Sequence, residues 1–239
     1  INQEKLDRFR SMIASLDPDG LPRATYISEV STPEHSDRCL VLDAAFNPPT
    51  NAHVALALNG ARSSRADRIL YQLSLSNVDK SVSGADLGQR LYMLDALAKA
   101  DESLVSICSH ARFVDKARAL QSLSPQTVHI FAIGYDTLIR LFDPKYYTDI
   151  AASLDELFAL AEFAVANRSE HDTQSVVDYL AGPSCKDYAD KIHQITLPPE
   201  FADVSSSGVR DRIHRSSDVS GWIPNDIASI IKAMGLYKK

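Results

Sequence analysis

A threonine and a histidine stand three residues apart, directly after an apolar segment that ends in two prolines. Thr50 and His53 lie at the start of a predicted helix over 51–61, and the apolar segment covers 39–45. Residues three apart share one face of a helix, and the unpaired N–H groups of a first helical turn attract anions. A hydroxyl, an imidazole and these N–H groups are suited to holding a phosphate. A purely structural alternative is that Thr50 or Asn51 only caps the helix.

A second set of polar residues has the same character near the other end of the chain. Ser205, Ser206 and Ser207 come directly before a helical pattern at 211–215, and Arg210 stands beside its start. Hydroxyls, backbone N–H groups and a guanidinium at one helix start can together bind a triphosphate. An ordinary serine cap next to a solvated arginine is the alternative.

These residues must be positioned by the segments around them, in which short apolar runs alternate with amphipathic ones. The runs that indicate strands are 39–45, 68–75, 104–108, 128–133 and 163–166. The segments with helical periodicity are 51–61, 87–98, 113–123, 137–142 and 154–161. This alternation predicts an α/β fold with a doubly wound parallel sheet and helices on both faces. Such sheets bind ligands at the carboxyl ends of their strands.

The two ends of the chain and one internal range depart from this rhythm. Residues 1–37 are expected to form an N-terminal helical extension, and 38–239 the main domain. The range 169–204 contains prolines and polar residues that interrupt the alternation, and we expect an insertion or lid there, with a helix and then a strand at 192–197. A closing helix is predicted over 224–236.

Composition limits the classes of function. The formal net charge is −6, which argues against a protein that coats nucleic acid. The three cysteines share no metal-like spacing and favour a reducing compartment, so we expect a cytoplasmic or nuclear protein. No apolar run approaches the roughly 20 residues of a membrane span, so no membrane partner is expected. The sequence leaves open the oligomeric state and a targeting segment before Ile1.

The polar motifs resemble those of one enzyme family. The run from Phe46 to His53 resembles the nucleotidyltransferase signature Gly-x-Phe-x-Pro-x-(His or Thr)-x-x-His, and the run from Ser205 to Arg210 resembles its Ile-Ser-Ser-Thr-x-Ile-Arg motif. Between them, Gly-x-Asp-x-Leu and Val-x-x-Arg motifs also have counterparts, the first of which begins at Gly134. In this order the motifs resemble the nicotinamide mononucleotide (NMN) adenylyltransferase family, in a fungal branch. That resemblance implies a Rossmann-like fold.

The resemblance also implies roles for individual residues. Those expected to act on the transferred phosphates are Thr50, His53 and Arg210. Gly134 would let a nucleotide approach the backbone, and Asp136 would accept hydrogen bonds from a ribose. The full set implied to bind ATP is Ala45, Phe46, Asn47, Gly134, Asp136, Arg168, Ser206 and Ser207.

The acceptor side of the resemblance is less complete. The residues implied to bind the acceptor mononucleotide are Asn77, Lys80, Arg90 and Tyr147. Tyr147 stands where the family often stacks a tryptophan on nicotinamide, and a tyrosine ring can also stack. The family's Gly-Ser before the phenylalanine is replaced by Ala44 and Ala45, which removes a hydroxyl that can meet the mononucleotide.

The reaction implied is adenylyl transfer from ATP to nicotinamide or nicotinate mononucleotide, which gives NAD or its deamido form and pyrophosphate. Mg²⁺ would enter with the ATP phosphates rather than in a protein cage. Two alternatives remain at this point. The acceptor could be another phosphorylated molecule, since the motifs read ATP. The chain could also be a nucleotide-binding or weakly ATP-hydrolysing regulator with a decayed acceptor site, which uses residues 1–37 and 169–204 for partners.

Overall fold

A computed structural model describes residues 1–27, 38–75, 84–166, 173–201 and 203–238. The helices are α1 (Gln3–Ala14), α2 (Asn51–Ser64), α3 (Leu87–Asp101), α4 (Phe113–Leu123), α5 (Tyr135–Leu141), α6 (Ile150–Leu160), α7 (Thr173–Ala181), α8 (Ser206–His214) and α9 (Asn225–Met234). The strands are β1 (Ala24–Tyr26), β2 (Arg38–Asp43), β3 (Arg68–Ser74), β4 (Leu104–Cys108), β5 (Val128–Gly134), β6 (Ala161–Ala166) and β7 (Ile192–Ile195). Short 3₁₀ turns cover Pro144–Tyr146, Lys186–Lys191 and Pro199–Phe201.

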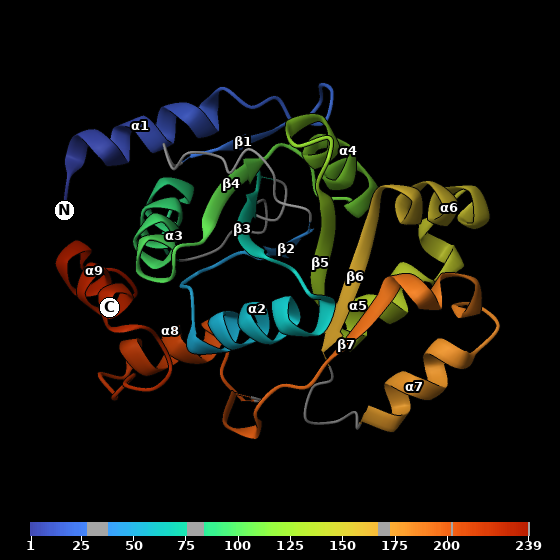
Figure 1. Cartoon of the computed structure of the whole chain (residues 1–239). Coiled ribbons are helices and arrows are strands. Elements are labelled where there is room, and N and C mark those ends of the chain that lie inside the picture. Colours follow the sequence, from blue (N-terminus) through green and yellow to red (C-terminus); the bar gives the residue numbers. More distant parts are fainter. Residues whose placement is uncertain (28–37, 76–83, 167–172, 202, 239) are drawn as a thin grey trace.

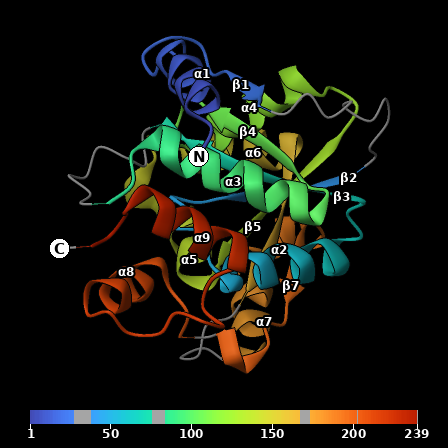
Figure 2. The ribbon, with the colours of Figure 1, turned by 90° about the vertical axis from the view of Figure 1, so that its left-hand side faces the viewer.

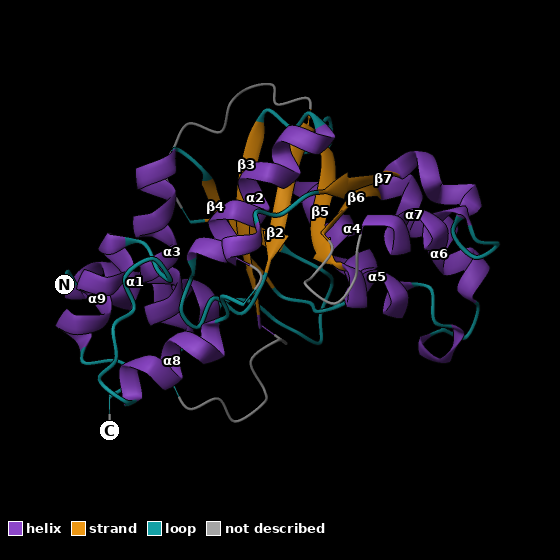
Figure 3. Cartoon of the chain, turned by 90° about the horizontal axis from the view of Figure 1, so that it is seen from below, coloured by secondary structure: helices purple, strands orange, loops and turns teal. Residues whose placement is uncertain are grey.

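Within the described residues the strands form one seven-stranded sheet, in the order β1-β4-β3-β2-β5-β6-β7 (Figure 3). The strand β1 is antiparallel to β4, and all other neighbours are parallel. The chain winds outward from β2 in one direction through β3 and β4, and in the other through β5, β6 and β7. This reversal places a crevice at the carboxyl ends of β2 and β5, where open α/β sheets bind ligands. The predicted doubly wound α/β fold is confirmed.

Helices cover both faces of the sheet because successive strand residues point to opposite sides. On β3, Tyr71 packs with the core formed by α1, α2, α3, α8 and α9, whereas Leu70 packs with the core formed by α4, α5, α6 and α7. Figures 1 and 2 show these two helical layers with the sheet between them. The sheet is therefore buried from both sides, as its near-continuous apolar strands require.

The N-terminal segment belongs to this body. The predicted helix is present as α1, whose Phe9 is buried against α3 and whose Lys5 forms an ion pair with Asp95. Beyond α1, residues 24–26 form the edge strand β1, with Thr25 opposite Ile107 of β4. The sequence did not predict this strand, because three residues are too few to show an alternating pattern.

The described part of the range 169–204 adds a helix and a strand to the sheet. After α7, the strand β7 pairs in parallel with β6, with Gln194 opposite Val165. The buried Cys185 lies in the connection between α7 and β7. The helix and the strand expected in this range are present as α7 and β7, and residues of the stretch after β7 line the cavity described below. The assignment of 169–204 as an insertion or lid stays a prediction.

An ion-paired cluster ties together β2, β6 and β7 at their amino ends. Glu162 accepts hydrogen bonds from Arg38 at 2.5 Å and from His193 Nε2 at 2.7 Å. Burial by itself would raise the pKa of Glu162, but the hydrogen bonds from Arg38 and His193 outweigh it and the pKa is lowered. The ionised carboxylate is therefore favoured in the folded protein.

We expect Glu162→Gln to lower the free energy of unfolding at neutral pH by about 1 kcal/mol. Because the folded-state pKa of Glu162 lies below its unfolded value, its stabilisation is present above the unfolded pKa and is lost as the pH falls through the folded one. Urea unfolding of both proteins between neutral pH and about pH 3 should therefore show the two stabilities converging. A difference that stays constant with pH would assign the stabilisation to packing alone.

Candidate active site

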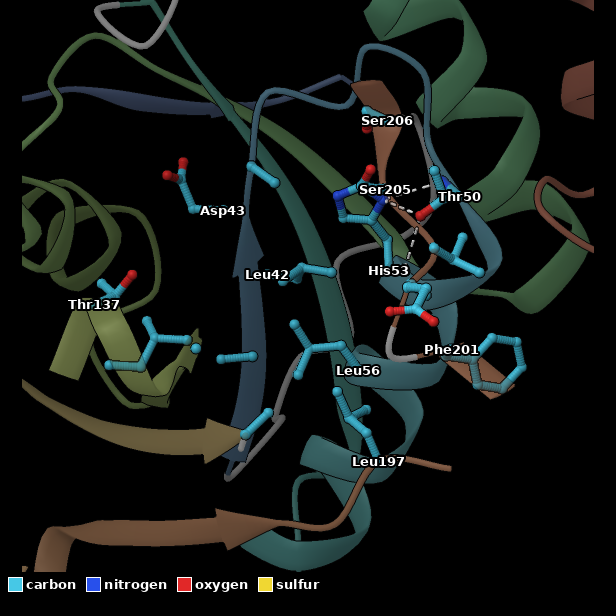
Figure 4. Close-up of a pocket in the computed structure, with 18 of the residues that line it drawn as sticks. Leu42, Asp43, Thr50, His53, Leu56, Thr137, Leu197, Phe201, Ser205 and Ser206 are labelled. Carbon is cyan, nitrogen blue, oxygen red and sulfur yellow. Dashed lines mark hydrogen bonds between the residues drawn. The ribbon is translucent and has the colours of Figure 1, made fainter. Parts of the chain in front are cut away.

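A cavity of about 850 Å³ opens at the carboxyl ends of β2 and β5. Figure 4 shows its two ends, with Thr50, His53, Ser205 and Ser206 on one side and Asp43 and Thr137 on the other. Leu56, Leu197 and Phe201 form an apolar part. The remaining lining residues are Leu42, Ala44, Ala52, Phe113, Ala132, Ile133, Gly134, Ala166, Pro198, Pro199, Asp203 and Val204.

The start of α2 brings together the two residues of the first motif. Thr50 is the N-cap, and its Oγ1 accepts a hydrogen bond from the backbone N–H of His53 at 3.3 Å. In return, Nδ1 of His53 accepts from the backbone N–H of Thr50 at 3.0 Å. Since Nδ1 is an acceptor, the proton of the neutral imidazole lies on Nε2. The cap thus fixes the tautomer of His53, with the proton on Nε2, and His53 lines the cavity.

The ring of Phe46 packs against the ring of His53. Its backbone has a φ of +45°, an unusual value for a residue with a side chain, and its ring is buried. The ring centroid lies 5.0 Å from that of His53 and 5.9 Å from that of Tyr71. The buried ring thus packs against the imidazole that lines the cavity, and the prediction that Phe46 binds ATP stays a prediction.

The start of α8 is joined to the loop that precedes α2. Ser205 is the N-cap and accepts from the Gly208 N–H at 3.1 Å. Ser206 Oγ donates to the Pro48 carbonyl at 2.7 Å, and an Nη1 of Arg210 donates to the Asn47 carbonyl at 2.7 Å. The N-caps of the two helices, Thr50 and Ser205, are 155 residues apart in sequence, and both line the same cavity.

Trp222 fixes the relative position of α8 and α2. Its backbone carbonyl accepts from Asn51 N–H at 2.9 Å, and its ring lies 4.1 Å from the guanidinium carbon of Arg212. A Cβ on Gly208 would lie 2.9 Å from the Trp222 ring. Only glycine therefore allows this close approach without a shift of the ring.

Other residues predicted to bind ATP lie at or near the same edge. Gly134 is the N-cap of α5 and lines the cavity, and Asp136 is exposed in the first turn of that helix. Ser207 is exposed, with its Oγ 3.2 Å from that of Ser205. Arg168 lies outside the described residues.

Asn47 and Ala45 hold the loop rather than line the cavity. The Asn47 side chain is buried, and its Oδ1 accepts from the N–H of Ala85 at 3.3 Å and from the hydroxyl of Tyr237 at 2.8 Å. The Ala45 carbonyl accepts from Arg90 at 3.4 Å. The prediction that Asn47 and Ala45 bind ATP stays a prediction.

The side chain of Arg90, which was predicted to bind the acceptor, is buried beside the loop that follows β2. Its side chain is 1% exposed and does not line the cavity, because Nε donates to the Ala85 carbonyl at 2.8 Å and Nη1 to the Ala45 carbonyl. Burial lowers the pKa of Arg90, but a guanidinium stays charged in proteins. Arg90 therefore links the loop after β2 to the segment before α3 through these two hydrogen bonds. Asn77 and Lys80, the other two polar candidates, lie outside the described residues.

Tyr147 also does not line the cavity. Its hydroxyl donates to the Leu141 carbonyl at 2.7 Å, and burial raises its pKa. The aromatic rings at the cavity are instead those of Phe113 and Phe201. The prediction that Tyr147 stacks on the acceptor's ring is therefore not supported.

We expect Tyr147→Ala to lower thermal stability while it changes the affinities for ATP and NMN by similar, small factors, because the ring packs beneath a loop. Tyr147→Phe should cost about 1 kcal/mol through the lost hydrogen bond alone. Thermal melts and calorimetric titrations of both variants test this. A selective loss of NMN affinity in a stable Tyr147→Ala protein would restore the stacking role.

Sequence reasoning missed an ion pair at the cavity. Asp43 ends β2 and lines the cavity, and it pairs with Lys116 of α4. A carboxylate at the end of a buried strand is a signal that could have indicated Asp43. Lys116 gave none, since lysines on amphipathic helices are mostly exposed.

No set of three or more His, Cys, Asp or Glu side chains in the described part of the chain is arranged to hold a metal ion. Among the described helices, none has the length and apolar character needed to cross a membrane. The hydroxyls of Thr50, Ser205 and Ser206 and the imidazole of His53 are donors suited to phosphate oxygens rather than ligands of a hard cation.

Comparison with known proteins agrees with this geometry. A family model described as cytidylyltransferase-like matches residues 41–212. A Schizosaccharomyces pombe protein named "Putative nicotinamide mononucleotide adenylyltransferase" is 30% identical over 230 residues, covering 86% of this chain and 88% of that protein. A "Probable nicotinate-nucleotide adenylyltransferase" of Marinobacter nauticus is 26% identical over 214 residues, covering 83% and 95% respectively.

Among solved structures, a Plasmodium falciparum nicotinic acid mononucleotide adenylyltransferase complexed with NaAD superposes with a TM-score of 0.61 and 16% identity, covering 84% of this chain and 97% of that one. This likeness shows the shared fold. The matched range contains both Thr50 and Arg210, so the model spans the two motifs that meet at the cavity. The chain belongs to the cytidylyltransferase-like family.

Proposed function

We propose that this protein is an adenylyltransferase that joins ATP to nicotinamide or nicotinate mononucleotide, giving NAD or its deamido form and pyrophosphate. The observation that carries the proposal is the convergence of the α2 and α8 N-termini on one cavity, linked by the hydrogen bonds of Ser206 and Arg210 to the preceding loop. The names of the relatives and of the structural neighbour support the same substrate class.

The phosphate-binding end of the cavity would hold the reacting groups. An oxygen of the acceptor's 5′-phosphate attacks the α-phosphorus of ATP, the bond from that phosphorus to the bridging oxygen breaks, and pyrophosphate leaves with the electron pair. His53 Nε2 donates to an α-phosphate oxygen as charge moves toward the leaving group, and the serine-rich start of α8 with Arg210 receives the β and γ phosphates. Positioning and charge stabilisation account for the rate, with no covalent intermediate.

The rest of the cavity would hold the two nucleosides. Leu56, Leu197 and Phe201 offer an apolar surface suited to adenine. Asp43 lies on the other side (Figure 4), and the ring of the lining residue Phe113 lies 5.2 Å from Nζ of Lys116, which pairs with Asp43. These two residues would receive the acceptor's nucleoside. The residues present fit Mg²⁺ as an ion held by phosphate oxygens and water. The exposed Asp203, which lines the cavity, is the nearest carboxylate to Ser205 in sequence. When bound beside the phosphates, the Mg²⁺ ion would neutralise charge on the pyrophosphate.

A single assay tests the proposal. The protein is incubated with ATP, Mg²⁺ and either NMN, nicotinate mononucleotide or phosphopantetheine, and products are identified by mass. Formation of NAD or its deamido form with release of pyrophosphate is the expected result. Product only from phosphopantetheine would change the acceptor. ADP and phosphate without any dinucleotide would favour the nucleotide-hydrolysing regulator, for which the loss of the family's Gly-Ser at Ala44 and Ala45 is the argument.

A further inference from the structure

The ion pair between Asp43 and Lys116 is buried at the end of the cavity proposed to receive the acceptor's nucleoside. The two side chains are 5% and 3% exposed. Asp43 Oδ2 accepts from Lys116, and Oδ1 accepts from Ser74 Oγ at 2.5 Å. Two separate elements, β3 and α4, thus hold one carboxylate at the end of β2.

This pair is difficult to explain by stability. Taking both charges out of water costs several kcal/mol, and a well-packed apolar pair of similar volume is often as stable. Neighbouring Asp115 pairs with Arg112, the N-cap of α4, and with Arg118 of the same helix, rather than with Lys116. Among these two aspartates, Lys116 pairs with Asp43.

The two partners differ in what they present to the cavity. Asp43 lines it, whereas Lys116 is behind and is not a lining residue. The Lys116 Nζ also lies 5.2 Å from the centre of the Phe113 ring, which does line the cavity. A ligand at this end would therefore meet an aromatic ring and a carboxylate whose charge is balanced from the far side.

A carboxylate accepts hydrogen bonds and repels another carboxylate. The amide N–H₂ of nicotinamide can donate to it, whereas the carboxylate of nicotinate cannot. We propose that Asp43, held by Lys116, makes this enzyme select the amide acceptor NMN over the acid nicotinate mononucleotide. This inference rests on the proposed function and names its acceptor.

The test is the ratio of kcat/KM for NMN to that for nicotinate mononucleotide, because this ratio does not depend on the fraction of protein that is folded. Wild type should favour NMN by about tenfold or more. Asp43→Asn should reduce the ratio by about tenfold or more, toward or past unity, since the buried Lys116 then attracts the acid. Glu162→Gln removes a paired carboxylate at the opposite ends of the strands and should leave the ratio unchanged.

A second variant guards against misfolding. Asp43→Leu combined with Lys116→Met removes both charges, should remain folded, and should bring the ratio close to one. A ratio in Asp43→Asn within about twofold of wild type overturns the inference, as does an equal loss on both acceptors, which would assign Asp43 to a group that both acceptors share, such as the ribose. If wild type forms no product with NMN and none with nicotinate mononucleotide, the proposed function itself is overturned.

Discussion

Replacement of His53 by alanine is expected to lower kcat by a factor of about 100 or more. The reason is the fixed tautomer: Nδ1 accepts from the Thr50 N–H, so Nε2 carries the proton that can meet phosphate charge in the transition state. Steady-state kinetics with ATP and NMN measure this directly. A kcat within about threefold of wild type would remove His53 from the chemistry.

Alanine at this position also removes half of the capping box, so stability must be separated from catalysis. We expect His53→Ala to cost about 1 kcal/mol of unfolding free energy, because the Thr50 N–H loses its acceptor. His53→Asn provides the matched control, since its amide oxygen can still accept from that N–H but no Nε2 remains. Both variants should lose the same activity, and only the alanine variant should lose stability.

Local patterns predicted those parts of the fold that depend on local interactions. Helix α2 begins where it was predicted, with Thr50 as its cap, and the buried parallel strands are near-continuous apolar runs. Helix α8 begins at Ser206, five residues before the helical pattern predicted at 211–215. The convergence of the two motifs followed from the βαβ order, because that order places the ends of parallel strands at one edge.

Interactions between distant segments were not predictable in this way. Arg90 was predicted to bind the acceptor, yet its side chain is buried and donates hydrogen bonds to two backbone carbonyls from different loops. The strand β1 exists only because β4 offers an edge, and the pairing of Asp43 with Lys116 joins residues 73 apart. A single charged residue in a sequence does not show whether a partner or water will surround it.

The second large effect concerns Arg210. We expect Arg210→Ala to raise the Kd for ATP by about 10- to 100-fold, because one charge-assisted hydrogen bond to the phosphates is lost. The Kd for AMP should rise far less. Only ATP carries the β and γ phosphates proposed to lie at the start of α8. Calorimetric titration of both nucleotides measures the difference.

Arg212 is the matched control for charge, because it lies on the same helix but stacks on Trp222 and donates to the Asp218 carbonyl. Arg212→Ala should leave the ratio of ATP to AMP affinity unchanged. Arg210 donates to the Asn47 carbonyl in the structure. If it kept this contact throughout, its role would be to hold the loop before Thr50. That role would weaken ATP and AMP equally, since both nucleotides place an α-phosphate beside that loop. Unequal losses would therefore mean that the guanidinium leaves the Asn47 carbonyl for the phosphates, and equal losses that it never does.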